Sequence, residues 1–295
     1  MPLRVTQGMM QSQLLRNLSN NVKRMSNTEN ELTTARKLNK PSDDPVGITY
    51  ALRYRSELSI NEQYQKNIDF AKSSVDHTDS VLGQINDIIQ RASELTVKGV
   101  SGTNPQDALN AIAKEIGSLF DEAITLGNSQ MNGKYIFNGQ FTDKKPYTTG
   151  TESTDTAEIK YEFSAGVVIP INITGNEVFG EGTETDNLFT VLKGIQNAFV
   201  NGDQATARDF MEKLKVRQDK FSQVRSEVGA RANRIDLMDN RLKDLEMNLT
   251  SMNSKTEDAD MAETMIRMQR DENVYQASLS SGAKIIQPSL LDYLR

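Results

Sequence analysis

Apolar residues recur at alternating spacings of three and four along the C-terminal part of the chain. The pattern starts at Phe221, continues for more than four heptads to Met252, and is broken only by Arg231. Heptad spacing is typical of long α-helices that pack side by side, and this helix is about 48 Å long at roughly 1.5 Å per residue. The predicted seam consists of Phe221, Val224, Val228, Arg231, Ile235, Met238, Leu242, Leu245, Leu249 and Met252.

A second seam follows the polar segment 253–258, where we expect a break between two helices. Methionine is common in this seam, and it suits both an adaptable partner-binding surface and a packed helix core. The two interpretations merge if the packing partner is another chain. The seam consists of Met261, Met265, Met268, Glu272, Tyr275, Leu279, Gly282 and Ile286.

The N-terminal half contains three further helical patterns. Narrow apolar stripes cannot be buried alone, so we expect them to pack against the other end of the chain and against neighbouring copies. One helix starts with Asn104 as its N-cap and Pro105 as its first residue. Another is a stripe, interrupted at Glu29, of Leu14, Leu18, Val22, Met25 and Leu32. The third pattern has heptad register and consists of Ile68, Ala71, Val75, Thr78, Leu82, Ile85, Ile89 and Ala92.

In the middle of the chain the period changes from 3.5 to 2. Residues 159–163 alternate apolar and polar, residues 164–166 include a Gly that can turn the chain, and residues 167–173 alternate again. This pattern predicts a β-hairpin with a three-residue loop, and Pro170 makes its second strand an edge strand. A further short strand is expected around 135–137. Helix returns at Asn187, and residues 201–203 separate it from the long C-terminal helix.

The distribution of aromatic residues divides the chain in the same way. None of the 18 Phe and Tyr residues lies in residues 1–49, whereas eight lie between Tyr135 and Phe189. We predict a mainly α fold with a small β-containing middle (α+β), long antiparallel helices and discontinuous domains. Residues 1–45 plus 253–295 form terminal coiled-coil segments, residues 46–130 plus 187–252 form a helical rod, and residues 131–186 form a small β-rich outer module.

Composition excludes much chemistry. The chain has no Cys and no Trp, and its single His is His77. Thiol nucleophiles, disulfides and Cys-based metal sites are therefore impossible, and a His-based site would rest on one residue. Gly-rich nucleotide-binding motifs and a GxSxG motif are absent from the sequence. We expect no catalytic residue, no cofactor and no metal, and we expect His77 to be a solvated surface side chain.

The charge balance argues against nucleic acid as a partner. The net charge is −6, although residues 1–40 carry seven basic and two acidic side chains, a local charge of +5. Because polar residues interrupt the segment after Arg4, we expect no signal peptide. Because no stretch approaches about 18 apolar residues, we expect no insertion into a membrane.

Two acidic motifs contain the carboxylates that a cation site needs, but both fit helix starts better. The first consists of Ser42, Asp43, Asp44 and Pro45, with Asp44 as N-cap and Pro45 as first helical residue. The second, Asp258 to Glu263, lacks the spacing of a calcium loop and suits the acidic first turn of the helix that carries the Met-rich seam. The residues alone thus favour an intermolecular scaffold over an enzyme. A cytoplasmic coiled-coil adaptor or signalling protein is the alternative.

Six segments together resemble the flagellin superfamily across nearly the whole chain, least between 147 and 186. They are RVT at 4–6, LNKPSDDPVG at 38–47, NGKYIFNG at 132–139, GARANRID at 229–236, EDADMAE at 257–263 and QPSLLDYLR at 287–295. Within the superfamily they are closer to the hook-associated members of the hook-filament junction than to flagellin.

This resemblance implies a structural role outside the cell. The terminal segments would be disordered in the monomer and would pair as coiled coil on assembly, in a ring of copies at the hook-filament junction. The partners would be the hook-side hook-associated protein, flagellin, and, during secretion, the flagellar type III export apparatus with an export chaperone. Flagellin, the bulk filament subunit, is the alternative within the family. The assembly interface is predicted at Leu14, Leu18, Val22, Met25, Leu32, Met261, Met265, Met268, Leu279 and Ile286.

Overall fold

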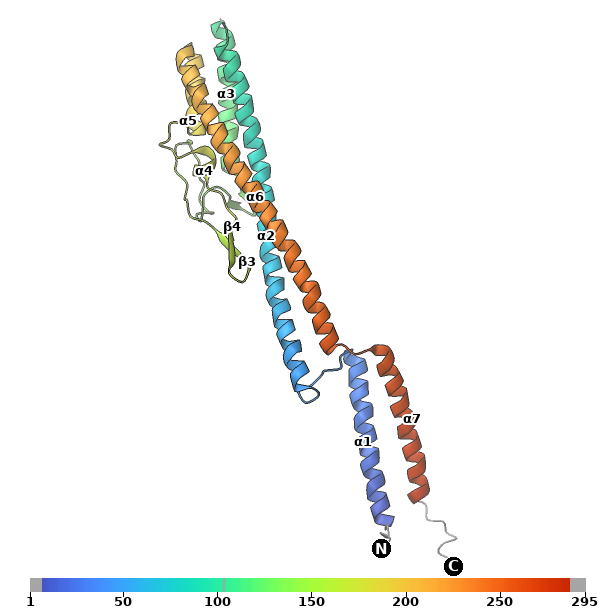
Figure 1. Ribbon diagram of the computed structural model, residues 1–295. Coiled ribbons are helices and arrows are strands. Elements are labelled where there is room, and N and C mark those ends of the chain that lie inside the picture. The colour runs from blue at the N-terminus through green and yellow to red at the C-terminus, as the bar shows by residue number, and fades with distance from the viewer. Residues whose placement is uncertain (1–6, 103, 287–295) are drawn as a thin grey trace, which may run out of the picture. The chain divides into compact units, whose positions relative to one another are not determined.

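A computed structural model describes residues 7–102 and 104–286 of the chain (Figure 1). The segments RVT at 4–6 and QPSLLDYLR at 287–295 lie outside the described residues. Ile286 is the last residue of a helix, and its side chain also lies outside the described part.

Helices dominate, as the seams predict, and the predicted fold class is confirmed. The strands are β1 (Gln130–Met131), β2 (Lys134–Tyr135), β3 (Lys160–Ser164) and β4 (Val167–Pro170). The helices are α1 (Gln7–Thr34), α2 (Pro45–Val100), α3 (Gln106–Gly127), α4 (Gly175–Phe179), α5 (Leu188–Val200), α6 (Gln204–Glu257) and α7 (Met261–Ile286).

The chain forms two compact units, and each is discontinuous in sequence. Unit 1 combines residues 1–60 with 245–295, and unit 2 comprises residues 61–244. Unit 1 therefore holds α1, α7, the first turns of α2 and the last turns of α6. The finer division into terminal segments, rod and outer module stays a prediction.

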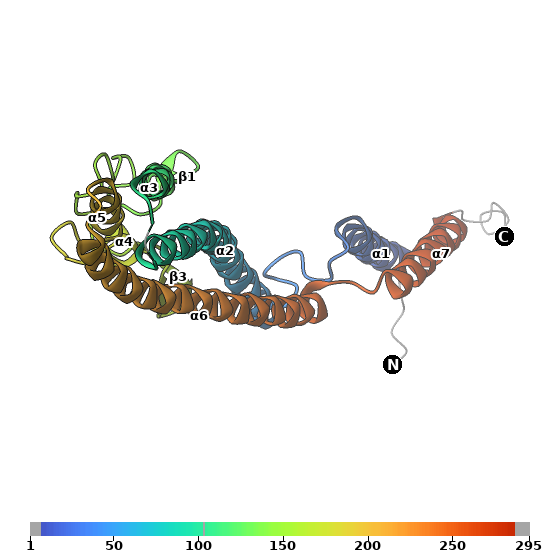
Figure 2. The same ribbon diagram turned by 90° about the horizontal axis from the view of Figure 1, so that it is seen from above.

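The core of unit 2 lies between α2 and α6, which run side by side (Figures 1 and 2). All eight predicted seam positions of α2, from Ile68 to Ala92, are buried. Every seventh position of the α6 seam is also buried, from Phe221 to Leu242. Ion pairs between Lys72 and Asp236 and between Arg225 and Asp79 fix the direction, because numbers that rise along α2 fall along α6. The pair is antiparallel.

Helices α3 and α5 pack against each other and complete this core. The N-terminus of α3 differs from the prediction. Pro105 is the N-cap, and the Asn104 side chain instead donates hydrogen bonds to the carbonyls of Lys98 and Gly99 at 2.9 and 3.0 Å. Asn104 caps the end of α2, because the last carbonyls of a helix have no intrahelical donors.

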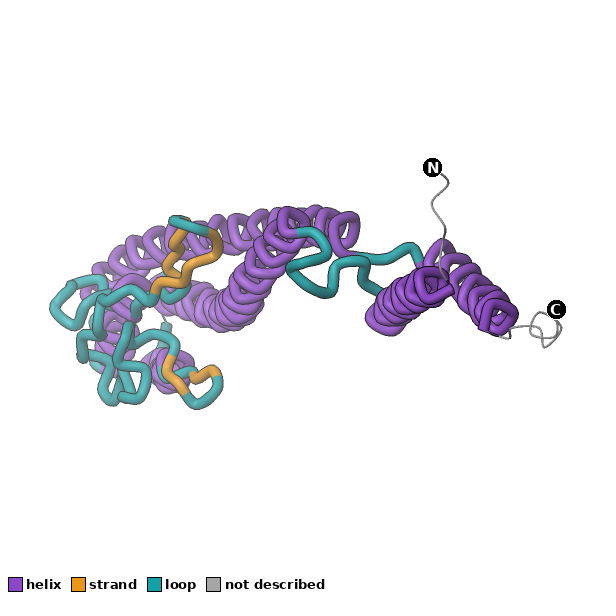
Figure 3. Tube along the Cα trace, turned by 90° about the horizontal axis from the view of Figure 1, so that it is seen from below, coloured by secondary structure: helices purple, strands orange, loops and turns teal. Residues whose placement is uncertain are grey.

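The β-containing middle lies beside the helices of unit 2 (Figure 3). The predicted hairpin is confirmed: β3 and β4 pair antiparallel, with Lys160 opposite Pro170. Its loop has two residues instead of the predicted three, because Ser164 pairs with Val167 and extends β3. β4 ends at Pro170, which has no N–H for the ladder. The strand expected around 135–137 is displaced to β2, which pairs with β1, and Phe137 instead enters a buried aromatic cluster with Tyr147, Phe179 and Phe189.

Two polar residues of unit 2 were not anticipated in these positions. Arg217 is fully buried and pairs with Glu184 at 2.5 Å and Asp186 at 2.9 Å, which compensates a charge that could not be buried alone. His77 is only half exposed, and its Nε2 atom is covered. The histidine expected to be a solvated surface side chain is therefore only partly exposed, because neighbouring residues cover one ring nitrogen.

The break predicted at 253–258 is also shorter than expected. α6 continues to Glu257, and α7 starts at Met261. Only Lys255 and Asp258 of this polar segment are exposed, and Glu257 is buried because it is paired with arginine side chains. Within unit 1 only part of the α6 seam is covered. Leu249 is buried, but Leu245 and Met252 are 45% and 49% exposed.

Candidate assembly interface

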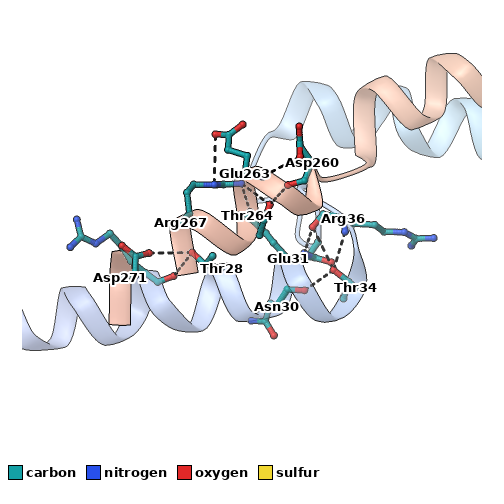
Figure 4. Close-up of polar contacts among 12 residues, drawn as sticks. Thr28, Asn30, Glu31, Thr34, Arg36, Asp260, Glu263, Thr264, Arg267 and Asp271 are labelled. Atoms are coloured by element: carbon teal, nitrogen blue, oxygen red, sulfur yellow. Dashed lines mark hydrogen bonds and ion pairs between the residues drawn. The ribbon is translucent and has the colours of Figure 1, made fainter. Parts of the chain in front are cut away.

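The two terminal helices, α1 and α7, pack against each other as an antiparallel pair. Three polar contacts define the register. Asn21 Nδ2 donates to Ser278 Oγ at 2.8 Å, Thr28 Oγ1 donates to Asp271 Oδ2 at 3.3 Å, and Arg267 Nη2 pairs with a Glu31 carboxylate oxygen at 2.9 Å (the last two are seen in Figure 4). The N- and C-terminal segments thus meet within a single chain.

The contact between these helices follows a strict heptad, but half of it is polar. Leu14, which lies beside Gly282, marks one end of the seam, and a Cβ on Gly282 would approach it within 2.8 Å. The covered positions of α1 are Leu14, Leu18, Asn21, Met25, Thr28 and Leu32, with Glu31 beside the last of them. Those of α7 are Thr264, Met268, Asp271, Tyr275, Ser278 and Gly282, with Arg267 beside Met268.

Four of the predicted apolar positions therefore do not lie on this seam. Val22 is 42% exposed, and Asn21 is buried in its place. On α7, Met261, Met265 and Leu279 are exposed, and the seam passes through Thr264, Asp271 and Ser278 beside them. The physical reason is that each buried polar side chain has a hydrogen-bond partner, so polarity does not exclude it. Asn21 and Thr28 bond across the seam, and Thr264 bonds to the Asp260 carbonyl within α7. Counting apolar residues missed these positions, and heptad spacing could not correct the error on α7, because the predicted register and the covered register have the same spacing.

The polar seam provides register more than stability. Thr28 and Asp271 are both buried, and the Thr28 hydroxyl also donates to the Arg24 carbonyl at 3.1 Å. Arg267 additionally donates to the Thr264 hydroxyl at 3.1 Å. A buried hydrogen bond contributes only about 1 kcal/mol net, whereas polar residues in a heptad seam specify which residues face each other. The pair is well specified and weakly held.

Apolar side chains point away from this seam instead. On α7, Met265, Ile266, Val274 and Ala277 line a shallow groove together with Gln269, Arg270 and Asn273. At about 100° per residue, this face lies opposite the seam. Ile266 is 70% exposed and Met265 is 65% exposed. On α1, Leu15 and Val22 are seven residues apart and exposed on one face. Exposed apolar faces of this kind mark interaction surfaces.

The helix-start motif positions α2. Pro45 begins the helix, Asp44 Oδ1 accepts from Val46 N at 3.0 Å, and the Asp44 carbonyl accepts from Ile48 N. Asp43 Oδ2 accepts from the backbone N–H of Lys40 at 2.9 Å, so that the turn containing Ser42 is closed.

Asp260 starts α7 in the same way, because its Oδ1 accepts from Ala262 N at 2.9 Å and Glu263 N at 3.1 Å. Within residues 7–102 and 104–286 no three His, Asp or Glu side chains are grouped as a metal would require. Over the same residues, no helix has both the length and the apolar character needed to cross a bilayer.

Comparison with known proteins identifies both ends of the chain. Residues 5–142 match the bacterial flagellin N-terminal helical region, and residues 211–294 match the bacterial flagellin C-terminal helical region. The chain is 28% identical to flagellar hook-associated protein 3 of Escherichia coli K12 over 306 residues, which cover 94% of this chain and 95% of that protein. It is 27% identical to Bacillus subtilis flagellin, with 88% of each chain covered.

Solved structures show the same fold. A putative flagellar hook-associated protein from Vibrio parahaemolyticus superposes with a TM-score of 0.67 at 20% identity, covering 73% of this chain and all of that one. Bacillus cereus FlgL superposes with a TM-score of 0.61 at 23% identity, covering 68% of this chain and 99% of that one.

Proposed function

Because the chain belongs to the flagellin superfamily and is a structural protein of the bacterial flagellum, we propose that copies of it form the ring at the hook-filament junction. The hook-side hook-associated protein would bind one side of the ring, and flagellin the other. Family membership sets aside the cytoplasmic adaptor interpretation, and the family is one of structural rather than catalytic proteins.

The observation that carries this proposal is the distribution of side chains on the terminal helix pair, which has polar residues inside and apolar residues outside. Its internal seam is half polar, while Met265, Ile266 and Val274 on α7 face outwards, as do Leu15 and Val22 on α1. An isolated pair would gain more from burying the apolar faces inside. Outward apolar faces are favourable only when neighbouring copies cover them, at about 25 cal/mol per Å² of apolar surface buried.

Ile266→Asp tests this interface with little effect on the monomer, because Ile266 makes no seam contact. We expect the variant to stay folded by circular dichroism and to lose co-assembly with flagellin and with the hook-side protein. Gln276→Asp places the same charge on an exposed polar position of α7 and should assemble normally. Normal assembly of Ile266→Asp would refute the outer face of α7 as an interface.

Truncations test the terminal helices as a whole. Deletion of residues 1–41 or 252–295 should leave unit 2 folded and soluble but unable to assemble. Rings or filaments formed by either truncated chain would assign assembly to another part of the molecule.

We further propose that the terminal segments order fully only on assembly, after export through the flagellar type III apparatus with a chaperone. The weakly held seam supports this, since its few net-favourable contacts barely offset the ordering entropy of the two helices. Circular dichroism of the monomer at micromolar concentration should then show less helix than α1 to α7 contain. Full helicity would contradict the proposal.

Localisation separates the junction from the filament. Immunogold labelling of intact cells should give a single band at the distal end of the hook. Flagellin is the second candidate, favoured by the similarity to the B. subtilis protein over 88% of both chains. Copy number decides between them, because a filament subunit dominates the protein of sheared filaments and a junction subunit is a trace component.

A further inference from the structure

A buried carboxylate lies where the two interhelix connections of unit 1 meet. Glu257 is the last residue of α6 and is only 1% exposed. Its Oε1 atom pairs with Arg36 Nε at 2.9 Å, and its Oε2 atom accepts from Arg55 Nε at 2.9 Å. The second Arg55 nitrogen, Nη2, also contacts Oε1. Arg36 follows α1, and Arg55 belongs to α2, so one side chain joins three segments.

Backbone hydrogen bonds run through the same point. Lys37 N donates to the Glu257 carbonyl at 2.8 Å, and Ala259 N donates to the Ala35 carbonyl at 3.0 Å. The connections after α1 and after α6 thus form a short antiparallel bridge between Arg36 and Asp258. Ala35 has a φ of 55°, a left-handed conformation that a residue with a Cβ adopts rarely. A strained residue persists where its surroundings hold it.

Helix stability does not explain this glutamate. A negative charge at the C-terminus of α6 opposes the helix dipole, and a buried carboxylate is costly unless it is paired. Both penalties are offset only by guanidinium groups from outside α6. These ion pairs instead fix the positions of the helix ends, because Glu257 and its two arginine partners hold the ends of α1 and α6 together.

We propose that Glu257, through Arg36 and Arg55, is the positioning residue of the terminal helix pair. By joining the connection after α1 to the end of α6, it holds the last turn of α1 beside the first turn of α7. Pairing along the weak polar seam then proceeds at a high effective concentration and in one register. Only one consequence of this inference rests on the proposed function, namely that the positioned helix pair presents the assembly surface in the correct geometry.

Hydrogen exchange of the full-length monomer, followed by mass spectrometry, tests the joint. In Glu257→Gln, amides of the peptides containing Lys37 and Ala259 should exchange about tenfold faster, and amides of α1 should follow because the pair separates more often. Amides of α3 in unit 2 should not change. Glu62→Gln is the matched control, since Glu62 is an exposed carboxylate that pairs with Lys66 at 2.8 Å on α2.

Arg55→Met provides a second variant and a coupling test. It should reproduce part of the effect of Glu257→Gln, because Arg36 remains paired with Glu257. The double variant should add little to Glu257→Gln, because the ion pair with Arg55 is already lost in that variant. The proposal is overturned if the amides of the peptides containing Lys37 and Ala259 are unprotected in the parent chain, or if they exchange within twofold of the parent in Glu257→Gln. It is also overturned if these amides exchange faster while those of α1 do not change, or if those of α3 exchange faster to the same extent. These measurements need no assembly, so their outcome is independent of the Ile266→Asp test.

Discussion

The two antiparallel helix pairs of this chain share one spacing and differ in chemistry. In unit 2, the α2–α6 seam is almost entirely apolar and is completed by α3, α5 and the aromatic cluster. In unit 1, the α1–α7 seam has polar residues at half of its positions, and Tyr275 is the one aromatic residue of the two helices. Heptad spacing therefore decides that helices pair, whereas the residues at the seam decide whether the pair is stable without further partners.

The difference also explains where apolar surface is exposed. α2 turns its buried stripe inwards along its whole length in unit 2, but the outer face of α7 carries Met265, Ile266 and Val274. A helix pair that is stable alone needs no exposed apolar face. A helix pair that functions in assembly combines a specific contact between its own helices with an apolar outer face that binds neighbouring subunits.

The largest expected effect comes from the apolar seam. Leu82→Ala, in the buried heptad of α2, should lower the free energy of unfolding of unit 2 by about 3 kcal/mol, through lost burial and the cavity left behind. Urea unfolding monitored by circular dichroism measures it. Leu18→Ala, on the half-buried seam of α1, should change the same transition by less than about 0.5 kcal/mol. Equal effects would remove the distinction between the two pairs.

Converting the polar seam should strengthen it. The double variant Asn21→Leu with Ser278→Ala replaces a buried hydrogen-bonded pair by apolar side chains of similar volume and should stabilise the α1–α7 pair by about 2 kcal/mol. Slower hydrogen exchange of α1 amides measures this. Asn17→Leu, on an exposed position of α1, serves as the control. Faster exchange in the double variant would show that the polar contact is itself the main source of stability.

Removing one buried partner should have a smaller effect of opposite sign. Thr28→Val leaves Asp271 buried without its hydroxyl donor and should destabilise the α1–α7 pair by about 1 kcal/mol. Thr33→Val removes a hydroxyl that only bonds its own helix and should exchange like the parent. A neutral Thr28→Val would mean that the 3.3 Å contact contributes nothing.

The smallest effect is expected for the partly exposed ion pair. A double-mutant cycle of Glu31→Gln and Arg267→Met should give a coupling of about 0.5 kcal/mol for α1–α7 pairing, and high salt should reduce it. Hydrogen exchange at two salt concentrations measures the coupling. A coupling independent of salt would indicate that Thr264 and the buried neighbours, rather than the charges, hold Arg267.

Much of the architecture followed from the pattern of residues. The eight α2 positions from Ile68 to Ala92, the hairpin around Gly166 and the helix after Asn187 were predicted correctly. Val22, Leu245 and Met252 were placed on seams that leave them exposed. These errors share a cause: apolar character reports a tendency to be covered but not the element that covers it.

Periodicity determined that the terminal helices need partner helices, because a narrow apolar stripe cannot be buried alone. It left open whether the partner is the other end of the chain or a neighbouring copy. It did not determine which residues face inwards, since a polar side chain is readily buried when it has a hydrogen-bond partner across the seam, as Thr28 and Asp271 show. The tertiary structure alone brought Arg36, Arg55 and Glu257 together. They lie up to 221 positions apart in sequence, so no local pattern links them, and only the folded chain supplies the charges that make this burial favourable.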